Sequence, residues 1–204
     1  MLIIFLILSV LHLLLIVYMP GSVPVGVTKG LPILFLILSL YSKVGIASNL
    51  KKFVFLGLIL SIAGDLLLIF PQYFLPGLVS FLLAHISYII GFSKGARLYP
   101  FRAIPFYGLG VLFFLYLRPG LGDMEFPVLF YMLTIGTMVW RASARNFANN
   151  HSYYAALSGA VVFLLSDCIL GFTKFKEHFA NENLAIMLTY YSAQYLIFEA
   201  ARSE

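Results

Sequence analysis

The chain has few charged side chains and almost no cysteine. Of its 204 residues only 13 are Lys or Arg and only eight are Asp or Glu, whereas 62% are apolar. So few charges could not cover the surface of a soluble globule, but an apolar exterior suits contact with lipid. The single cysteine, Cys168, excludes both an intramolecular disulfide and a metal site built from several cysteines. The composition therefore predicts an all-α, polytopic integral membrane protein.

Long apolar runs divide the chain into candidate membrane spans. About 20 apolar residues are needed to cross a hydrocarbon layer roughly 30 Å thick. Eight candidates lie at about 2–19, 29–43, 52–70, 74–93, 101–118, 126–141, 152–172 and 183–200, of which the second and sixth are short. The first lacks a basic leader and a small-residue cleavage pattern, so we interpret it as a retained helix. Because little chain lies between the spans, residues 1–204 are expected to form a single transmembrane helical domain of eight helices.

Lysine and arginine are unevenly divided between the two faces that these spans define. Nine of the 13 lie in the loops after the second, fourth and sixth spans or in the tail, namely Lys43, Lys51, Lys52, Lys94, Arg97, Arg102, Arg141, Arg145 and Arg202. Because basic residues accumulate on the cytoplasmic side, both termini are expected in the cytoplasm. The membrane would be the endoplasmic reticulum in a eukaryote and the inner membrane in a bacterium. The net charge of +5 is interpreted as topology and attraction to membrane lipids, and we expect no nucleic-acid partner.

Two aspartates interrupt the apolar spans and are the strongest functional candidates. Asp65 lies in LGLILSIAGDLLLIF and Asp167 in LSGAVVFLLSDCILGF. An aspartate in the middle of a membrane helix costs about 2.5–3.5 kcal/mol on insertion scales, so it normally faces the protein interior and has a partner or a function. The alternative is structural pairing of the aspartates with each other, with Lys29 or with His85.

The spacing of the aspartates points to an internal repeat. They are 102 residues apart in a chain of 204, and the same offset pairs Tyr88 with Tyr190. The third and fourth spans then match the seventh and eighth, whereas the first two show no clear match to the fifth and sixth. We therefore consider a four-plus-four repeat with halves 1–102 and 103–204, related by an axis along the membrane normal, which places both aspartates at one depth.

Further polar side chains share the depths and faces of the aspartates. On the third span, Gly57, Ser61 and Asp65 recur every fourth residue and share one face. The supporting candidates are Lys29, His85, Tyr88, Tyr190, Tyr191 and Gln194. We expect these groups to converge on one polar pocket in the non-cytoplasmic half to middle of the bundle. Each also has a structural interpretation as a helix–helix hydrogen bonder, an interfacial anchor or a snorkelling lysine. Since no HxxxH or ExxH spacing is present, no metal and no other cofactor are expected.

Several short strings, in order along the chain, resemble one known family. They are TKGLP at 28–32, GDLLL at 64–68, AHISY at 84–88, WRA at 140–142, SD at 166–167 and YYSAQ at 190–194. The ordered set, which extends over about 28–197, is similar to that of the YhhN family of eight-span membrane proteins. That family includes the lysoplasmalogenases of the transmembrane protein 86 group.

The resemblance implies a lysophospholipid substrate and hydrolysis of its sn-1 vinyl ether to a fatty aldehyde and glycerophosphoethanolamine or glycerophosphocholine. Such a bond is cleaved by protonation of its outer alkene carbon, addition of water to the oxocarbenium ion and collapse of the hemiacetal. One acid must give a proton and one carboxylate must stabilise charge or activate water, so the resemblance implies that Asp65 and Asp167 are catalytic, with their individual roles open. The phosphate contact would fall to Lys29.

Two other classes of function also fit parts of the sequence. A proton-coupled transporter of a lipid or small amphiphile uses membrane carboxylates and internal repeats, although Pro32 and Pro105 lie at helix starts rather than as breaks in matching spans. A lipid-binding or scaffold protein would need neither aspartate. Replacing Asp65 and Asp167 by Asn discriminates these classes, because only the hydrolase predicts collapse of lipid turnover in a folded protein.

Overall fold

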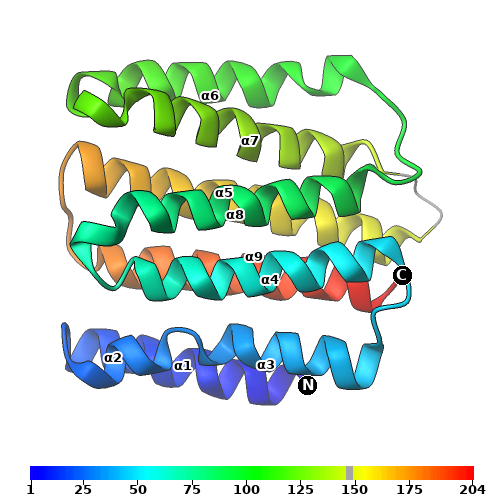
Figure 1. The fold of residues 1–204 in the computed structure, drawn as a ribbon, viewed down its shortest axis with the longest axis horizontal. Coiled ribbons are helices and arrows are strands. Elements are labelled where there is room, and N and C mark those ends of the chain that lie inside the picture. Colours follow the sequence, from blue (N-terminus) through cyan, green and yellow to red (C-terminus); the bar gives the residue numbers. More distant parts are fainter. Residues whose placement is uncertain (146–148) are drawn as a thin grey trace.

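The computed structural model describes residues 1–145 and 149–204, and its helices run side by side along one axis (Figure 1). The α-helices are α1 (Leu2–Tyr18), α2 (Val23–Thr28), α3 (Leu31–Ser39), α4 (Asn49–Leu67), α5 (Phe74–Ser93), α6 (Ile104–Leu117), α7 (Glu125–Ser143), α8 (Asn150–Phe175) and α9 (Glu182–Arg202). A π-helical segment, Leu40–Val44, extends α3, and 3-10 turns occupy Pro71–Tyr73, Pro100–Arg102, Arg118–Gly120 and Gly122–Met124. No strand occurs in the two described ranges, so the all-α prediction is confirmed.

Four helical stretches are long and apolar enough to cross a membrane: Val23–Val44, Pro71–Ser93, Pro100–Gly120 and Asn150–Phe175. The chain is therefore a helical membrane protein with several candidate spans. Each of the remaining predicted spans also coincides with a helix, α1, α4, α7 or α9. The second span is longer than predicted, because helical structure begins at Val23, next to Pro24 in the first turn of α2, rather than at residue 29.

The end of α4 also differs from the prediction. The helix ends at Leu67 rather than near residue 70, because Pro71 follows and the preceding Phe70 adopts an extended conformation. Asp65 therefore lies in the last turn of α4 and not in the middle of a span. Asp167, by contrast, lies eight residues before the last residue of α8, well inside that helix.

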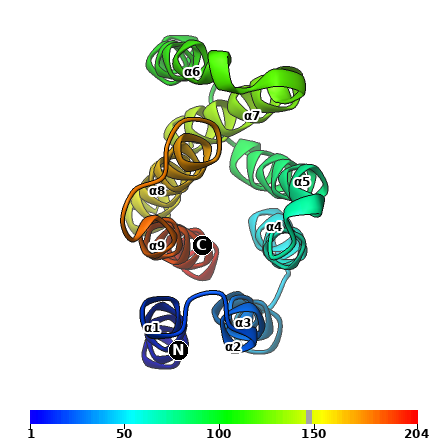
Figure 2. The ribbon, with the colours of Figure 1, turned by 90° about the vertical axis from the view of Figure 1, so that its left-hand side faces the viewer.

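The helices form layers around two central hairpins (Figure 2). The hairpin α4–α5 lies opposite the hairpin α8–α9, with α6 and α7 beyond one edge of this pair and α1 to α3 beyond the other. Within each hairpin the two helices pack most extensively on each other. Successive long helices alternate in direction, and the C-terminus lies at the same end of the bundle as the start of α4 (Figure 1).

Glycines permit the close approach of α5 to α4. A Cβ atom at Gly57 would collide with the ring of Tyr88, and one at Gly64 would lie 2.6 Å from the ring of Phe81. Tyr88 has no exposed surface, and Ser61 on the same face of α4 is equally buried. The predicted face of α4 is therefore confirmed as the face that packs against α5.

We expect Gly57→Ala to destabilise the protein by about 1–3 kcal/mol, because the added methyl group overpacks the Tyr88 ring. Gly108→Ala is the matched control, since a Cβ atom there has no neighbour within 4 Å. It should be neutral or stabilise by up to about 1 kcal/mol through helix propensity. Thermal unfolding in detergent measures both variants, and equal midpoints would contradict the close packing of α4 on α5.

Candidate active site

The first buried carboxylate is surrounded by a lysine and a tyrosine. Asp65 is 2% exposed, and its Oδ1 lies 3.7 Å from Lys29 Nζ. Tyr190 on α9 donates a hydrogen bond of 2.7 Å to Asp65 Oδ2. Tyr191 donates one of 2.7 Å to the main-chain oxygen of Lys29, which fixes the backbone between α2 and α3. The charge of this carboxylate is thus balanced and hydrogen-bonded inside the bundle.

A histidine that the sequence analysis did not single out extends this centre to α1. His12 is 1% exposed, and its Nδ1 lies 2.9 Å from the hydroxyl oxygen of Thr28. Its ring centroid is 5.7 Å from that of Tyr191. The available signal was a titratable residue inside an otherwise apolar helix, the same signal that identified the aspartates.

The second carboxylate has different partners. Tyr131 on α7 donates a hydrogen bond of 2.7 Å to Asp167 Oδ2, and His85 Nε2 on α5 lies 3.7 Å from the same oxygen. The side chain of Asp167 is 13% exposed, compared with 3% for Asp65. His85 is fully buried, and neither of its ring nitrogens has a hydrogen-bond partner within the described residues. Its ring packs edge-on against those of Tyr131 and Phe163, with centroid distances of 5.2 and 4.6 Å.

Tyr131 was missed by the sequence analysis, although the 102-residue offset contained the signal. That offset aligns Lys29 with Tyr131, and each contacts the aspartate that follows it by 36 residues. The other partners, Tyr190 and His85, come from the opposite half of the chain in each case. Applying the offset to all polar span residues, and not only to identical pairs, would have selected Tyr131.

An aromatic layer separates the two carboxylates. The Phe163 ring centroid lies 4.6 Å from that of His85 and 5.6 Å from that of Tyr190. Phe81 packs against Tyr190 from α5 at 5.8 Å. Across residues 1–145 and 149–204, no hydrogen bond or ion pair joins Asp65 to Asp167. The residues expected in one pocket therefore form two adjoining centres.

The remaining candidates, Tyr88 and Gln194, pair with each other. The Tyr88 hydroxyl donates a hydrogen bond of 2.8 Å to Gln194 Oε1, and both side chains are fully buried. This bond crosses from α5 to α9 and lies one to two helical turns from the Asp65 centre toward the other end of the bundle. It joins the two central hairpins.

The Asp167 centre adjoins an apolar groove. A partly open groove with a cavity volume of about 50 Å³ lies between α5, α6, α7 and α8, and its polar oxygen-bearing side chains are Asp167 and Tyr131. The other walls are apolar or carry a thiol, and include Leu78, Leu117, Ile135, Cys168, Gly171 and Phe175. Lys29 and Asp65 do not line it. This volume is smaller than the roughly 300–1,000 Å³ of enclosed small-molecule sites, so a lipid would occupy the groove from its open side. The groove thus places an apolar surface beside Asp167 and none beside Asp65.

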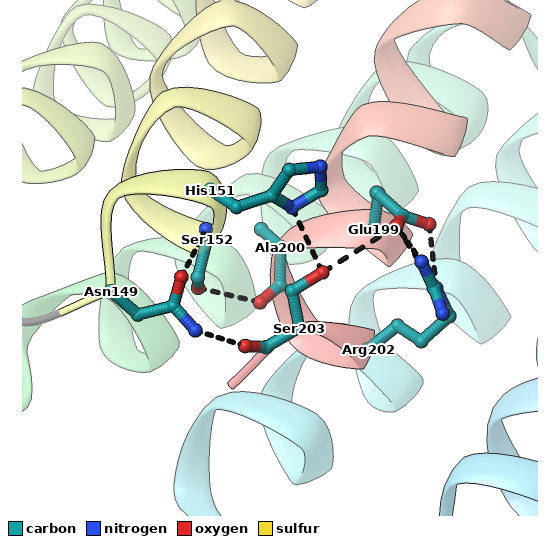
Figure 3. Close-up of polar contacts among 7 residues, drawn as sticks. All are labelled: Asn149, His151, Ser152, Glu199, Ala200, Arg202 and Ser203. Atoms are coloured by element: carbon teal, nitrogen blue, oxygen red, sulfur yellow. Dashed lines mark hydrogen bonds and ion pairs between the residues drawn. The ribbon is translucent and has the colours of Figure 1, made fainter.

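A third polar cluster, at the opposite end of the bundle, ties α8 to α9 (Figure 3). His151 Nδ1 lies 3.0 Å from the Ser203 hydroxyl, which in turn donates to Glu199 at 3.5 Å. A hydrolytic triad requires the carboxylate to orient the histidine, whereas here it accepts from the serine, so the cluster lacks that geometry. Asn149 caps α8 and also binds the Ser203 main-chain oxygen. Within the described part of the chain, no group of three or more His, Cys, Asp or Glu side chains could hold a metal ion.

The buried ion pair of the first centre should show strong coupling in a double-mutant cycle. Lys29→Met and Asp65→Asn should each cost about 3 kcal/mol, because each leaves a partner charge or polar group unbalanced in the bundle. The double variant should lose less stability than the two single variants lose together. Chemical or thermal unfolding in detergent measures the three variants.

The exposed pair of Arg118 and Glu125, 2.8 Å apart, supplies the control for that cycle. Glu125→Gln should change stability by less than about 1 kcal/mol, because water screens this pair. Additive losses for Lys29→Met and Asp65→Asn would contradict a buried ion pair at this position.

Comparison with known proteins places the chain in a family. The family model described as "YhhN family" matches residues 26–201. The chain is 34% identical to lysoplasmalogenase TMEM86B of Sus scrofa over 147 residues, and 35% identical to that of Homo sapiens over 152 residues. Each alignment covers 69% of this chain and 59% of the relative, so the chain spans about three fifths of the length of these curated proteins. A lysoplasmalogenase homolog of Dictyostelium discoideum is 30% identical over 58% of this chain and 49% of its own length. No solved structure matches. The chain belongs to the YhhN family.

Proposed function

We propose that the chain is a lysoplasmalogenase, which hydrolyses the sn-1 vinyl ether of a lysoplasmalogen within the membrane. The observation that carries this proposal is the apolar groove that Asp167 and Tyr131 line, with His85 Nε2 3.7 Å from Asp167 Oδ2. A single-chain ether lipid needs an apolar site and a proton donor at the same place, and the groove supplies both. The curated relatives are lysoplasmalogenases, which supports the same reaction here.

Asp167 is the proton donor in this proposal, because it is the aspartate that lines the groove. Its carboxyl group gives a proton to the outer alkene carbon, and the resulting carboxylate stabilises the oxocarbenium ion. Water adds to the carbon that bears the ether oxygen and returns a proton to the Asp167 carboxylate, and the hemiacetal releases a fatty aldehyde and the glycerophospho alcohol. His85, 3.7 Å from Asp167 Oδ2, orients that water, and Tyr131 holds the carboxyl group in place through its hydrogen bond of 2.7 Å.

Asp65 supports the reaction from behind the aromatic layer. Its hydrogen bond from Tyr190 fixes the ring that packs against Phe163, and Phe163 in turn packs against His85. Loss of the Asp65 carboxylate would release Tyr190 and change the position of His85. We therefore expect both aspartates to be required, with Asp167 acting on substrate and Asp65 as a positioning residue. Lys29, Tyr191 and the Tyr88–Gln194 pair hold the same framework.

The architecture that accompanies this function is a single domain of eight membrane helices, with α2 and α3 forming one pass. The alternating directions of the helices support an even number of passes, which places both termini on one face (Figure 1). Charge distribution favours the cytoplasmic face. The shared 36-residue spacing from Lys29 and Tyr131 to their aspartates supports a four-plus-four repeat. The expected partners are membrane lipids and the lysophospholipid substrate, with no cofactor.

The test is turnover by purified protein in detergent. Wild-type protein should release aldehyde from lysoplasmenylethanolamine and no fatty acid from the corresponding ester lysophospholipid, as read by mass spectrometry. Asp167→Asn should lower kcat by roughly 10²–10⁴, the usual contribution of a positioned acid. Asp65→Asn should lower it as well.

Thermal unfolding of each variant controls for loss of fold, and Asp123→Asn in the connection before α7 is a matched substitution that should leave turnover unchanged. Aldehyde release by a folded Asp167→Asn variant at the wild-type rate would contradict the assignment of the acid. No aldehyde from folded wild-type protein would reject the hydrolase. Transport would then be the leading function, since a proton-coupled carrier also needs buried carboxylates.

A further inference from the structure

The groove ends at a rim of aromatic side chains that holds a lysine. Phe74 is the first residue of α5 and Phe175 the last of α8, and both line the groove with ring centroids 6.0 Å apart. Lys174 Nζ lies 4.7 Å from the centroid of the Phe74 ring. On the neighbouring α6, the Tyr116 ring holds Lys176 Nζ at 4.6 Å. Two ammonium groups therefore lie where the groove meets the helix ends, with the exposed Glu177 directly after Lys176 in the sequence.

The nearby acidic side chain Glu182 does not neutralise this charge directly. Its carboxylate is paired with His178, whose Nδ1 lies 2.8 Å from Glu182 Oε1. The ammonium group of Lys174 contacts an aromatic ring. Its three N–H groups can still donate hydrogen bonds to an anionic ligand. An anion attached to a molecule in the groove would thus meet Lys174 at the rim.

The spacing along α8 matches the dimensions of the proposed substrate. Lys174 follows Asp167 by seven residues, which is about two turns or roughly 10.5 Å along the helix axis. In a lysoplasmalogen, the outer alkene carbon and the phosphorus are joined through six atoms: the inner alkene carbon, the ether oxygen, the three glycerol carbons and the phosphate ester oxygen. That chain has a comparable length when extended. A lipid with its phosphate at Lys174 therefore brings its vinyl ether to the level of Asp167.

Resting on the proposed function, we propose that Lys174 is the headgroup subsite of this enzyme and binds the substrate phosphate while the vinyl ether lies against Asp167. The subsite selects phosphorylated alkenylglycerols over neutral ones. Lys29, the residue that the sequence favoured for phosphate, has its ammonium group 3.7 Å from Asp65 and does not line the groove. Lys174 does not line the groove either, but its ammonium group lies over the ring of Phe74, which does, and it shares α8 with Asp167.

A purely structural role for Lys174 predicts a different experimental result. The residue lies in the last turn of α8, where a cation is favoured by the helix dipole. If Lys174 had only this role, replacing it would lower the stability of the protein without changing its preference between the two substrates. The test therefore compares two substrates with the same alkenyl chain, lysoplasmenylethanolamine and the corresponding 1-alkenylglycerol, which lacks the phosphoryl headgroup.

Lys174→Met should raise KM for the phospholipid about fivefold, the effect of one basic residue at a membrane surface, and leave KM for the alkenylglycerol unchanged. Lys174→Arg should restore the wild-type preference, because it restores the charge. Lys52→Met removes a lysine from the start of α4, at the opposite end of the bundle, and should alter neither value. Gly171→Leu should raise KM for both substrates, because even a Cβ atom there would lie 3.3 Å from Leu117 in the shared groove.

Equal KM changes for the two substrates in Lys174→Met, or none in a folded variant, would overturn the subsite while leaving the hydrolase intact. An unchanged KM for both substrates in Gly171→Leu would overturn the groove as their site. Absence of aldehyde from either substrate with wild-type protein would instead reject the proposed function, and the subsite with it.

Discussion

Burial of two carboxyl groups in an apolar helical bundle is the constraint on which the rest of the structure depends. Each must have partners, because an unpaired charge in such surroundings would destabilise the fold by several kcal/mol. Lys29 and Tyr190 satisfy Asp65, and Tyr131 with His85 surrounds Asp167. These partners come from different helices. The contacts that neutralise or solvate the carboxylates therefore also fix how α4 packs near α9 and how α8 packs near α5 and α7.

The two centres are alike in construction but differ in access. Asp65 is closed off by an ion pair and by Tyr190, whereas Asp167 lines an apolar groove. The Phe163 ring lies between them and touches both His85 and Tyr190. Catalysis on a lipid requires that substrate reach the acid, so access distinguishes two aspartates that sequence alone treats as equivalent. In this account the reaction takes place at Asp167, and the Asp65 centre fixes the aromatic residues that pack against the Asp167 centre.

Helix positions, the buried face of α4 and the presence of polar partners around both aspartates could be predicted from the sequence, because apolar run length and helical periodicity are local properties. The early end of α4 could also have been predicted from Pro71, because a proline favours an extended conformation in the residue before it, here Phe70. The division into two centres was not readable, because it depends on how α8 and α9 are rotated about their axes and on where Phe163 lies. Tyr131 was missed because the chain has 13 tyrosines, most of which need no special role. His12 was missed because α1 contains no acidic residue and no second basic residue that would have drawn attention to it.

The most direct test is an experimentally determined structure with a 1-O-alkyl lysophospholipid bound, since this saturated ether lacks the alkene that is protonated and so remains intact. The account predicts density for the ether oxygen and first chain carbons beside Asp167, in the groove between α5, α6, α7 and α8. Density for the ether beside Asp65 and Lys29, among α3, α4 and α9, would contradict it and transfer the reaction to the other carboxylate.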